Sequence, residues 1–240
     1  MTKVAVFCEG ETEQLFCQSL FNEVFVDKCE VQLEKLYGKQ GNRYLQLQFH
    51  RPLQGQEYLI RLFDCGGGGD QSVISEVQDL HKKFITEYEY DFIIAIRDVF
   101  PLSRDRINPM ITKFRQRIPT NPVADNPASV FLILSVMEIE AWFLAEHTHF
   151  QQIDARLSAG FIKDNFGFDP VTGDMEMRPH PKADLERIYE SAGRRYHISQ
   201  TVKALDMTRM YAELPQRYSP LAELTRILDL IYAAELPMGG

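Results

Sequence analysis

The sequence has few of the residues that mark disulfide scaffolds, zinc sites and membrane spans. It holds four cysteines and one tryptophan in 240 residues, with no Cys-x-x-Cys pair and no histidine at zinc-ligand spacing from a cysteine. We therefore expect reduced, mostly buried thiols and a cytoplasmic protein. The longest mostly apolar run, residues 130–136, is far shorter than the roughly 20 residues that cross a bilayer, so no membrane association is expected.

Basic residues are also outnumbered. Twenty-six lysines and arginines oppose 34 aspartates and glutamates, for a net charge of −8, which disfavours binding of nucleic acid through the overall field of the protein. Residues 101–118 nevertheless contain five basic side chains against one acidic, and residues 178–226 contain nine against six. Such segments are typical both of nucleic-acid-binding surfaces and of ordinary solvated helix faces.

The pattern of apolar residues predicts the fold class. Short apolar or β-rich runs alternate with segments of helical spacing up to about residue 148, which indicates a Rossmann-like α/β domain with a mainly parallel sheet flanked by helices. Only helical patterns follow, so we predict an α/β domain at 1–148 and a helical C-terminal extension at 149–240. The expected strands are residues 4–8, 44–49, 58–64, 92–96 and 129–136. The expected helices begin at an N-cap Thr12, after the glycines 66–69, after Pro101, and at 138, 182, 202 and 221, the one from 202 running to 211.

Acidic residues follow three of the expected strands. Glu9 closes the first strand, and Glu13 lies one turn into the helix that follows it. Asp98 follows the strand at 92–96, whereas Glu138 and Glu140 come after the strand at 129–136. Because parallel strands end at the same edge of a sheet, these acids can lie side by side. Converging carboxylates suit Mg²⁺ or Mn²⁺, which can activate water for attack on a phosphodiester.

A second interpretation of these acids needs no metal. Acidic residues are common in the first turn of a helix, where the macrodipole stabilises them by roughly 0.3–1 kcal/mol. Glu11, Glu13 and Glu138 fit that helix-capping role as well as they fit a role in a metal site. Glu9 fits it less well, since it ends a strand directly before the glycine turn at Gly10.

Several other residues are candidates for phosphate binding. Gly67 and Gly68 precede a helix, so their backbone N–H groups can approach a phosphate, although a simple flexible turn also explains them. Arg104 and Arg106 lie in the basic segment 101–118. Lys182 is a candidate for stabilising the charge of a transition state.

One pair of histidines has the spacing of metal ligands. His147 and His149 flank Thr148 beside Glu146, but no third ligand is placed with them. We therefore interpret both as exposed histidines at the end of a helix.

A family resemblance adds to this reading. Residues 4–13 (VAVFCEGETE), followed by Phe16, resemble the opening motif of TOPRIM domains, the fold shared by topoisomerases, bacterial primases and overcoming-lysogenisation-defect (OLD) nucleases. Residues 96–98 (IRD) and 137–144 (MEIEAWFL) are similar to a narrower bacterial TOPRIM-like family of unknown function. The resemblance covers about residues 1–148, with a further match at 180–182.

The resemblance implies roles for individual residues. Glu9 matches the TOPRIM glutamate that acts as general acid/base or metal ligand, and Glu13 matches the second acid of OLD-type nucleases. Asp98 matches the first aspartate of the DxD element, but Phe100 stands at the position of the second. Glu138 or Glu140 are the alternatives for the missing oxygen ligand. The departure at Phe100 puts two-metal catalysis in doubt.

These observations lead to three hypotheses. The first is a Mg²⁺- or Mn²⁺-dependent nuclease that acts on nucleic acid, with DNA favoured over RNA, in an anti-phage context that the resemblance implies. The second is a non-catalytic TOPRIM-like subunit that binds a partner ATPase through the helical extension. The third is a metal-dependent phosphatase or nucleotidyl-processing enzyme that acts on a small phosphate ester. Self-association into a homo-oligomer is left open.

Overall fold

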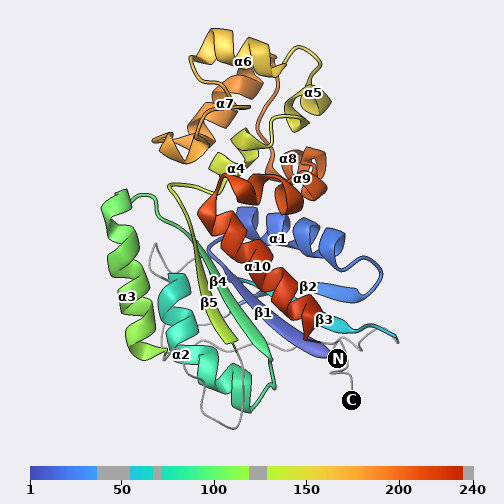
Figure 1. The fold of residues 1–240 in the computed structure, drawn as a ribbon, viewed down its shortest axis with the longest axis vertical. Coiled ribbons are helices and arrows are strands. Elements are labelled where there is room, and N and C mark those ends of the chain that lie inside the picture. The colour runs from blue at the N-terminus through green and yellow to red at the C-terminus, as the bar shows by residue number, and fades with distance from the viewer. Residues whose placement is uncertain (37–54, 67–71, 119–128, 235–240) are drawn as a thin grey trace. The chain divides into compact units, whose positions relative to one another are not determined.

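The computed structural model describes residues 1–36, 55–66, 72–118 and 129–234, and its ribbon is drawn in Figure 1. The strands are β1 Thr2–Cys8, β2 Cys29–Lys35, β3 Tyr58–Asp64, β4 Phe92–Asp98 and β5 Ser129–Ser135. The longer helices are α1 Glu11–Val24, α2 Ser72–Thr86, α3 Ile107–Arg117, α6 Ala159–Phe166, α7 Pro181–Ser191 and α10 Ser219–Ala233. The short helices are α4 Glu140–Ala145, α5 His149–Ile153, α8 Ile198–Ala204, α9 Met207–Ala212 and three 3₁₀ turns, η1 Arg104–Arg106, η2 Met175–Met177 and η3 Leu214–Gln216.

The strands form one five-stranded sheet in the order β2-β3-β1-β4-β5. The pairs β1–β3, β1–β4 and β2–β3 are parallel, and Cys8 lies in register with both Asp64 and Ile96. Parallel pairs need crossover connections, which α1 and α2 provide between successive strands. The predicted Rossmann-like α/β class, a parallel sheet flanked by helices, is confirmed, as are the strands predicted at 4–8, 58–64, 92–96 and 129–136.

The order of the strands reverses around β1. From β1 the chain passes through α1 to the edge strand β2, whereas from β3 it passes through α2 to β4 on the other side of β1. The carboxyl ends of β1 and β3 are therefore a topological switch point, the place where open α/β sheets bind ligands. Gln14 holds α1 at this edge, because its side-chain amide donates to the backbone oxygens of Leu62 at 2.7 Å and Glu34 at 3.0 Å.

An aromatic cluster packs α2 against the sheet. Phe7 of β1, Phe63 of β3 and Phe84 of α2 are fully buried, with ring centroids 5.1–5.3 Å apart in each pair. Aromatic rings at such separations contribute beyond the apolar area that they bury. Strand β4 is apolar along most of its length because both of its faces are covered, so side chains on both faces avoid water.

Some elements differ from the sequence prediction. Helix α1 begins at Glu11 with Gly10 as its N-cap, so the prediction of Thr12 as the cap is wrong. The helix predicted at 202–211 is two helices, because Asp206 caps a new helix by accepting a hydrogen bond from the backbone N–H of Arg209. Strand β2 and helices α5 and α6 were not predicted. The strand predicted at 44–49 lies outside the described residues.

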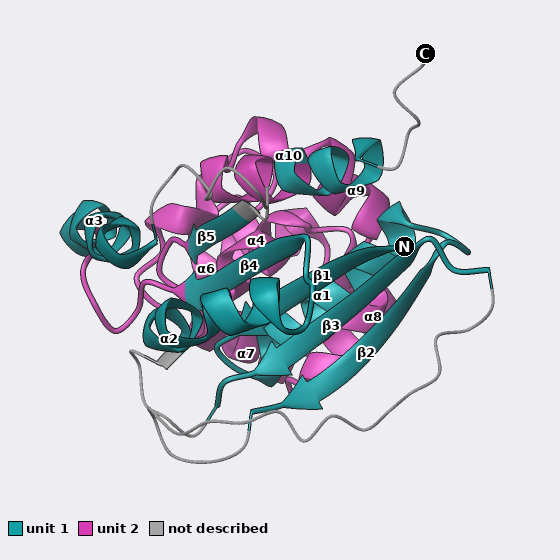
Figure 2. Ribbon diagram, turned by 90° about the horizontal axis from the view of Figure 1, so that it is seen from below, with its two compact units in different colours: residues 1–97, 105–134, 226–240 teal, residues 98–104, 135–225 magenta. Residues whose placement is uncertain are grey.

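The contacts divide the chain into two compact units, coloured in Figure 2. Unit 1 comprises residues 1–97, 105–134 and 226–240, and unit 2 comprises residues 98–104 and 135–225. The chain passes into unit 2 after Arg97, returns to unit 1 at Asp105, leaves it again after Leu134 near the end of β5 and returns within α10. The domain boundary at residue 148 stays a prediction. Among the described helices, none combines the length and the apolar character needed to cross a membrane.

The end of α10 is anchored within unit 1 by Tyr232. The hydroxyl of Tyr58 donates to the backbone oxygen of Tyr232 at 3.2 Å, and their rings are stacked with centroids 6.4 Å apart. The Nζ atom of Lys28 lies 5.0 Å from the centroid of the Tyr232 ring. The last turn of α10 is therefore fastened to the segment before β2 and to the start of β3.

We expect Tyr232→Ala to lower the free energy of unfolding by about 1–2 kcal/mol, because it removes a stacked ring and a cation–π contact. Leu230→Ala is the matched control, since Leu230 lies on the same helix with 41% exposure against 40% for Tyr232. The control is expected to change stability by less than about 0.5 kcal/mol. Urea unfolding followed by circular dichroism measures both, and equal losses in the two variants would contradict the anchoring role.

Candidate functional site

The first group of candidate residues lies at the carboxyl end of β1 in unit 1. Glu9 follows the strand directly, and its side chain is 26% exposed. Its Oε2 atom lies 3.9 Å from the Nε atom of Arg97, a β4 residue that is only 3% exposed. A nearly buried guanidinium beside a half-buried carboxylate creates a strong local field at this edge of the sheet.

Glu13 has a defined structural role. It is buried, and its Oε2 atom accepts a hydrogen bond from the backbone N–H of Gly10 at 2.8 Å. This contact is the glutamate half of a capping box, since Gly10 has no side chain to supply the other half. It supports the helix-capping interpretation of Glu13. Glu13 lies in the first turn of α1, where the macrodipole favours negative charge.

Sequence reasoning missed one acid at this edge. Asp64 ends β3 in register with Cys8, and its Oδ1 atom accepts from the backbone N–H of Gly66 at 2.6 Å. Its Oδ2 atom lies 3.9 Å from the Nζ atom of Lys35. The strand at 58–64 was predicted correctly, and its last residue is an acid, so the rule applied to the other strand ends would have identified Asp64 as a candidate. Gly67 and Gly68, the candidate phosphate-binding glycines, lie outside the described residues.

The second group of candidates belongs to unit 2. Asp98 accepts hydrogen bonds at Oδ1 from the Ser135 hydroxyl and, at 2.9 Å, from the backbone N–H of Ile139. Glu138 accepts from the backbone N–H of Lys182 at 3.0 Å, and buried Glu140 accepts from the Tyr196 hydroxyl at 3.2 Å. These three carboxylates therefore tie the turn before α4 to neighbouring segments of unit 2.

The basic candidates have different surroundings. In unit 2, Arg104 donates to the backbone oxygen of Glu176, and its Nη1 atom lies 2.9 Å from the sulfur of Met177. Lys182 is exposed at the N-terminus of α7. In unit 1, Arg106 is exposed at the start of α3. A joint site of Glu9 and Glu13 with the candidates of unit 2 stays a prediction.

The side chains at the end of β1 can be compared with the ligands that a divalent cation requires. Among the described residues, no group of three or more His, Cys, Asp or Glu side chains is arranged to hold a metal. Mg²⁺, however, commonly takes only one or two carboxylates and completes its shell with water and phosphate oxygens. Glu9 and Glu13 are oxygen donors of that kind, so they fit Mg²⁺ or Mn²⁺ by donor chemistry, and a cation bound by both stays a prediction.

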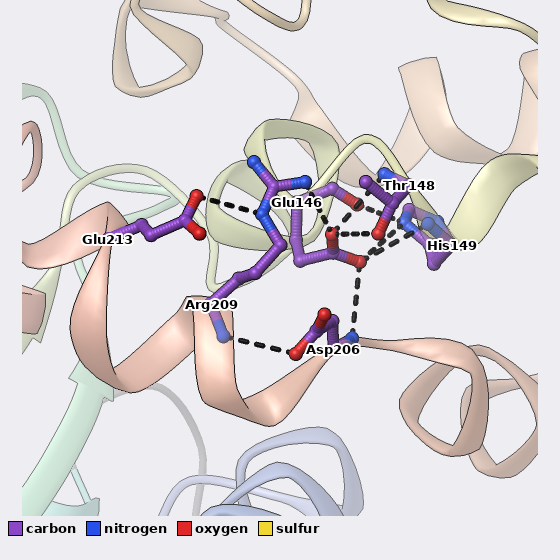
Figure 3. Close-up of polar contacts among 6 residues, drawn as sticks. All are labelled: Glu146, Thr148, His149, Asp206, Arg209 and Glu213. Carbon is purple, nitrogen blue, oxygen red and sulfur yellow. Dashed lines mark hydrogen bonds and ion pairs between the residues drawn. The ribbon is translucent and has the colours of Figure 1, made fainter.

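A buried polar network surrounds Glu146 in unit 2 (Figure 3). The fully buried Glu146 carboxylate accepts hydrogen bonds from the backbone N–H groups of Thr148, His149 and Asp206 at 3.2–3.3 Å, and from Arg209 Nη1 at 3.4 Å. Burial raises the pKa of Glu146, and the hydrogen bonds from Thr148 and Asp206 with the charge of Arg209 oppose that rise. The network joins the α4–α5 turn to the start of α9.

His149 is fully buried, so the prediction of an exposed histidine at this position is wrong. Its Nδ1–H donates to the backbone oxygen of Glu146, and its Nε2 atom is buried without a hydrogen-bond partner among the described residues. Burial lowers the pKa of His149 to about 4. The ring packs against the rings of Phe150 and Tyr189. The exclusion of water from this position favours the neutral imidazole.

We expect this histidine to make the protein sensitive to acid. Its folded pKa of about 4 lies below its ordinary value of 6.5, so the unfolded chain binds the proton more tightly. The contribution of His149 to stability is therefore present above pH 6.5 and is lost as the pH falls toward 4, by up to about 3 kcal/mol. The raised pKa of Glu146 has the opposite sign and offsets part of this loss.

Urea unfolding between pH 4.5 and 7.5 measures this effect. His149→Gln is expected to flatten the pH dependence of the free energy of unfolding, because glutamine has no group whose pKa differs between the folded and the unfolded chain. His197→Gln, at an exposed histidine, is the control and should keep the slope of the wild type. Parallel slopes for the wild type and His149→Gln would contradict the prediction.

Fold and site together define a class: an α/β protein with a Rossmann-like parallel sheet and carboxylates at its switch point. Comparison of the chain with models of known protein families, with curated proteins and with solved structures finds no match.

Proposed function

We propose that the protein is a phosphodiester hydrolase, a Mg²⁺- or Mn²⁺-dependent nuclease of TOPRIM type, and that DNA is its substrate. The observation that carries the proposal is the position of Glu9. Its half-buried carboxylate follows the central strand β1 at the point where the strand order reverses, beside the N-terminus of α1 and the guanidinium of Arg97. A carboxylate in such a place is suited to ligand chemistry rather than to packing.

The residues of this edge have separate tasks in the proposed reaction. Glu9 binds the cation or holds the proton of the attacking water at a carboxylate oxygen. Glu13 fixes the turn at Gly10 through its hydrogen bond to the backbone N–H, and its carboxylate is proposed as the second oxygen ligand. When bound, Mg²⁺ or Mn²⁺ supplies Lewis-acid chemistry and charge neutralisation at the phosphodiester. Exposed Arg106 is proposed to bind the phosphate backbone.

The direct test is a cleavage assay of the purified wild-type protein. Supercoiled plasmid, single-stranded DNA and RNA are incubated with Mg²⁺, with Mn²⁺ and with excess chelator. We expect nicking or degradation of DNA that the chelator abolishes. Absence of cleavage of every polymer under both metals would refute the proposal, and hydrolysis of nucleotides alone would favour the phosphatase hypothesis.

A second candidate function is a non-catalytic subunit that binds a partner ATPase. Two observations favour it: Phe100 stands where the resembled motif has a second aspartate, and the other acids already have structural partners. Glu13 and Glu138, for example, accept hydrogen bonds from backbone N–H groups. Stable co-purification with an ATPase encoded beside this protein, together with no binding of Mn²⁺, would select this candidate over the nuclease.

A further inference from the structure

We propose that Arg97 is the resident counter-ion of Glu9 and competes with a divalent cation for its carboxylate. Cation binding at Glu9 would then be weak in the free protein. This inference rests on the proposed role of Glu9 as a cation ligand. Arg97 thereby positions the Glu9 carboxylate and controls its affinity for a cation, a role additional to the proposed function of Glu9.

The placement of Arg97 carries the inference. It is the sole charged residue of β4 apart from the terminal Asp98, in a strand whose other side chains are apolar. Its side chain is 3% exposed, yet its Nε atom lies 3.9 Å from Glu9 Oε2. A charge in a buried strand is costly unless it is compensated, so the proximity of an anion is part of what makes Arg97 tolerable there.

The same proximity has a consequence for metal binding. A positive charge next to a carboxylate lowers the affinity of that carboxylate for a second cation, and the effect is strong where exposure to water is limited. A substrate phosphate brings negative charge and additional oxygen ligands, which shift the balance toward the cation. Arg97 thus makes cation binding dependent on a phosphate-bearing ligand.

The test measures the affinity of the full chain for Mn²⁺ by electron paramagnetic resonance of the free ion. Arg97→Met keeps the side-chain length and removes the charge, so Mn²⁺ is expected to bind about tenfold more tightly than to the wild type. Arg97→Lys keeps the charge and should bind as the wild type does. Arg117→Met removes the same charge from the surface of α3, and we expect its affinity to stay within about twofold of the wild type.

The direction of the change distinguishes this role from a merely structural one. Damage to the fold would weaken Mn²⁺ binding, whereas loss of a competing charge strengthens it. The gain must also vanish in Arg97→Met combined with Glu9→Gln. Unchanged or weaker binding by Arg97→Met, or equal tightening by Arg97→Lys, would overturn the inference.

A measurement on the wild type covers the case that Arg97→Met does not fold. The Nε–H resonance of Arg97, assigned with Arg97→Lys, is followed by NMR during titration with Mg²⁺. It should shift with the same midpoint as Mg²⁺ binding that depends on Glu9, and an unmoved resonance would overturn the inference. The cleavage assay is a separate readout: a protein that passes the affinity test without cutting DNA loses only the proposed nuclease function.

Discussion

Replacing Glu9 by glutamine is expected to lower DNA cleavage by at least about 100-fold, the range in which a positioned acid or base contributes to catalysis. The amide keeps the shape of the side chain but cannot accept the proton of water, and it is a poorer ligand for a hard cation. Initial rates of plasmid nicking at saturating Mn²⁺ measure the effect.

Glu11→Gln is the matched control for this prediction. Glu11 is an exposed carboxylate two residues from Glu9, in the first turn of α1. Its replacement removes the same charge from almost the same place and should leave the rate within about threefold, since an exposed charge is screened by solvent and salt. If Glu9→Gln cuts DNA as fast as Glu11→Gln does, Glu9 has no catalytic role.

Replacing Glu146 by alanine is expected to lower the free energy of unfolding by about 3–5 kcal/mol, the cost of breaking a buried, hydrogen-bonded charge network. The carboxylate accepts from three backbone N–H groups, of Thr148, His149 and Asp206. Alanine would leave these donors without an acceptor, at a cost of about 1–3 kcal/mol for each donor that water does not reach, of which the buried N–H of His149 is one. Urea unfolding at pH 7 measures the loss.

Glu213→Ala is the control for this second prediction. Glu213 pairs with the same arginine, its Oε2 atom lying 3.0 Å from Arg209 Nε, but its side chain is 61% exposed. Exposed pairs contribute about 0–1 kcal/mol, so the control should be nearly neutral. A loss below about 1 kcal/mol in Glu146→Ala would show that water or a rearranged Arg209 replaces the carboxylate.

The central strands were predictable because local composition and environment agree. Strand β4 is apolar along residues 92–96, as a strand covered on both faces must be, and β3 runs from one turn to a glycine-rich segment. Strand β2 was missed because a polar side chain is buried there and an apolar one is exposed. Its buried side chain is Gln32, which accepts from Arg61 Nε at 2.7 Å, whereas Leu33 is exposed.

Some site residues were likewise predictable from local sequence, whereas others were not. Glu9 was found because an acid after a strand and before a glycine is a local pattern. Glu13 was found by the same reading, but its hydrogen bond to Gly10 shows a capping role that the pattern could not separate from a ligand role. The burial of His149 was missed because it depends on packing against Tyr189, 40 residues further along the chain.

By itself the sequence determined the α/β class, the strands at 4–8, 58–64, 92–96 and 129–136, and the carboxylate at Glu9 as the first residue to test. Only the tertiary structure decided that Arg97 lies against Glu9 and that Glu146 and His149 are buried together. The physical reason is the distance along the chain between the residues that interact. Strand and helix patterns arise from neighbours along the chain, whereas the pairing and burial of charged groups arise from contacts between segments that folding brings together.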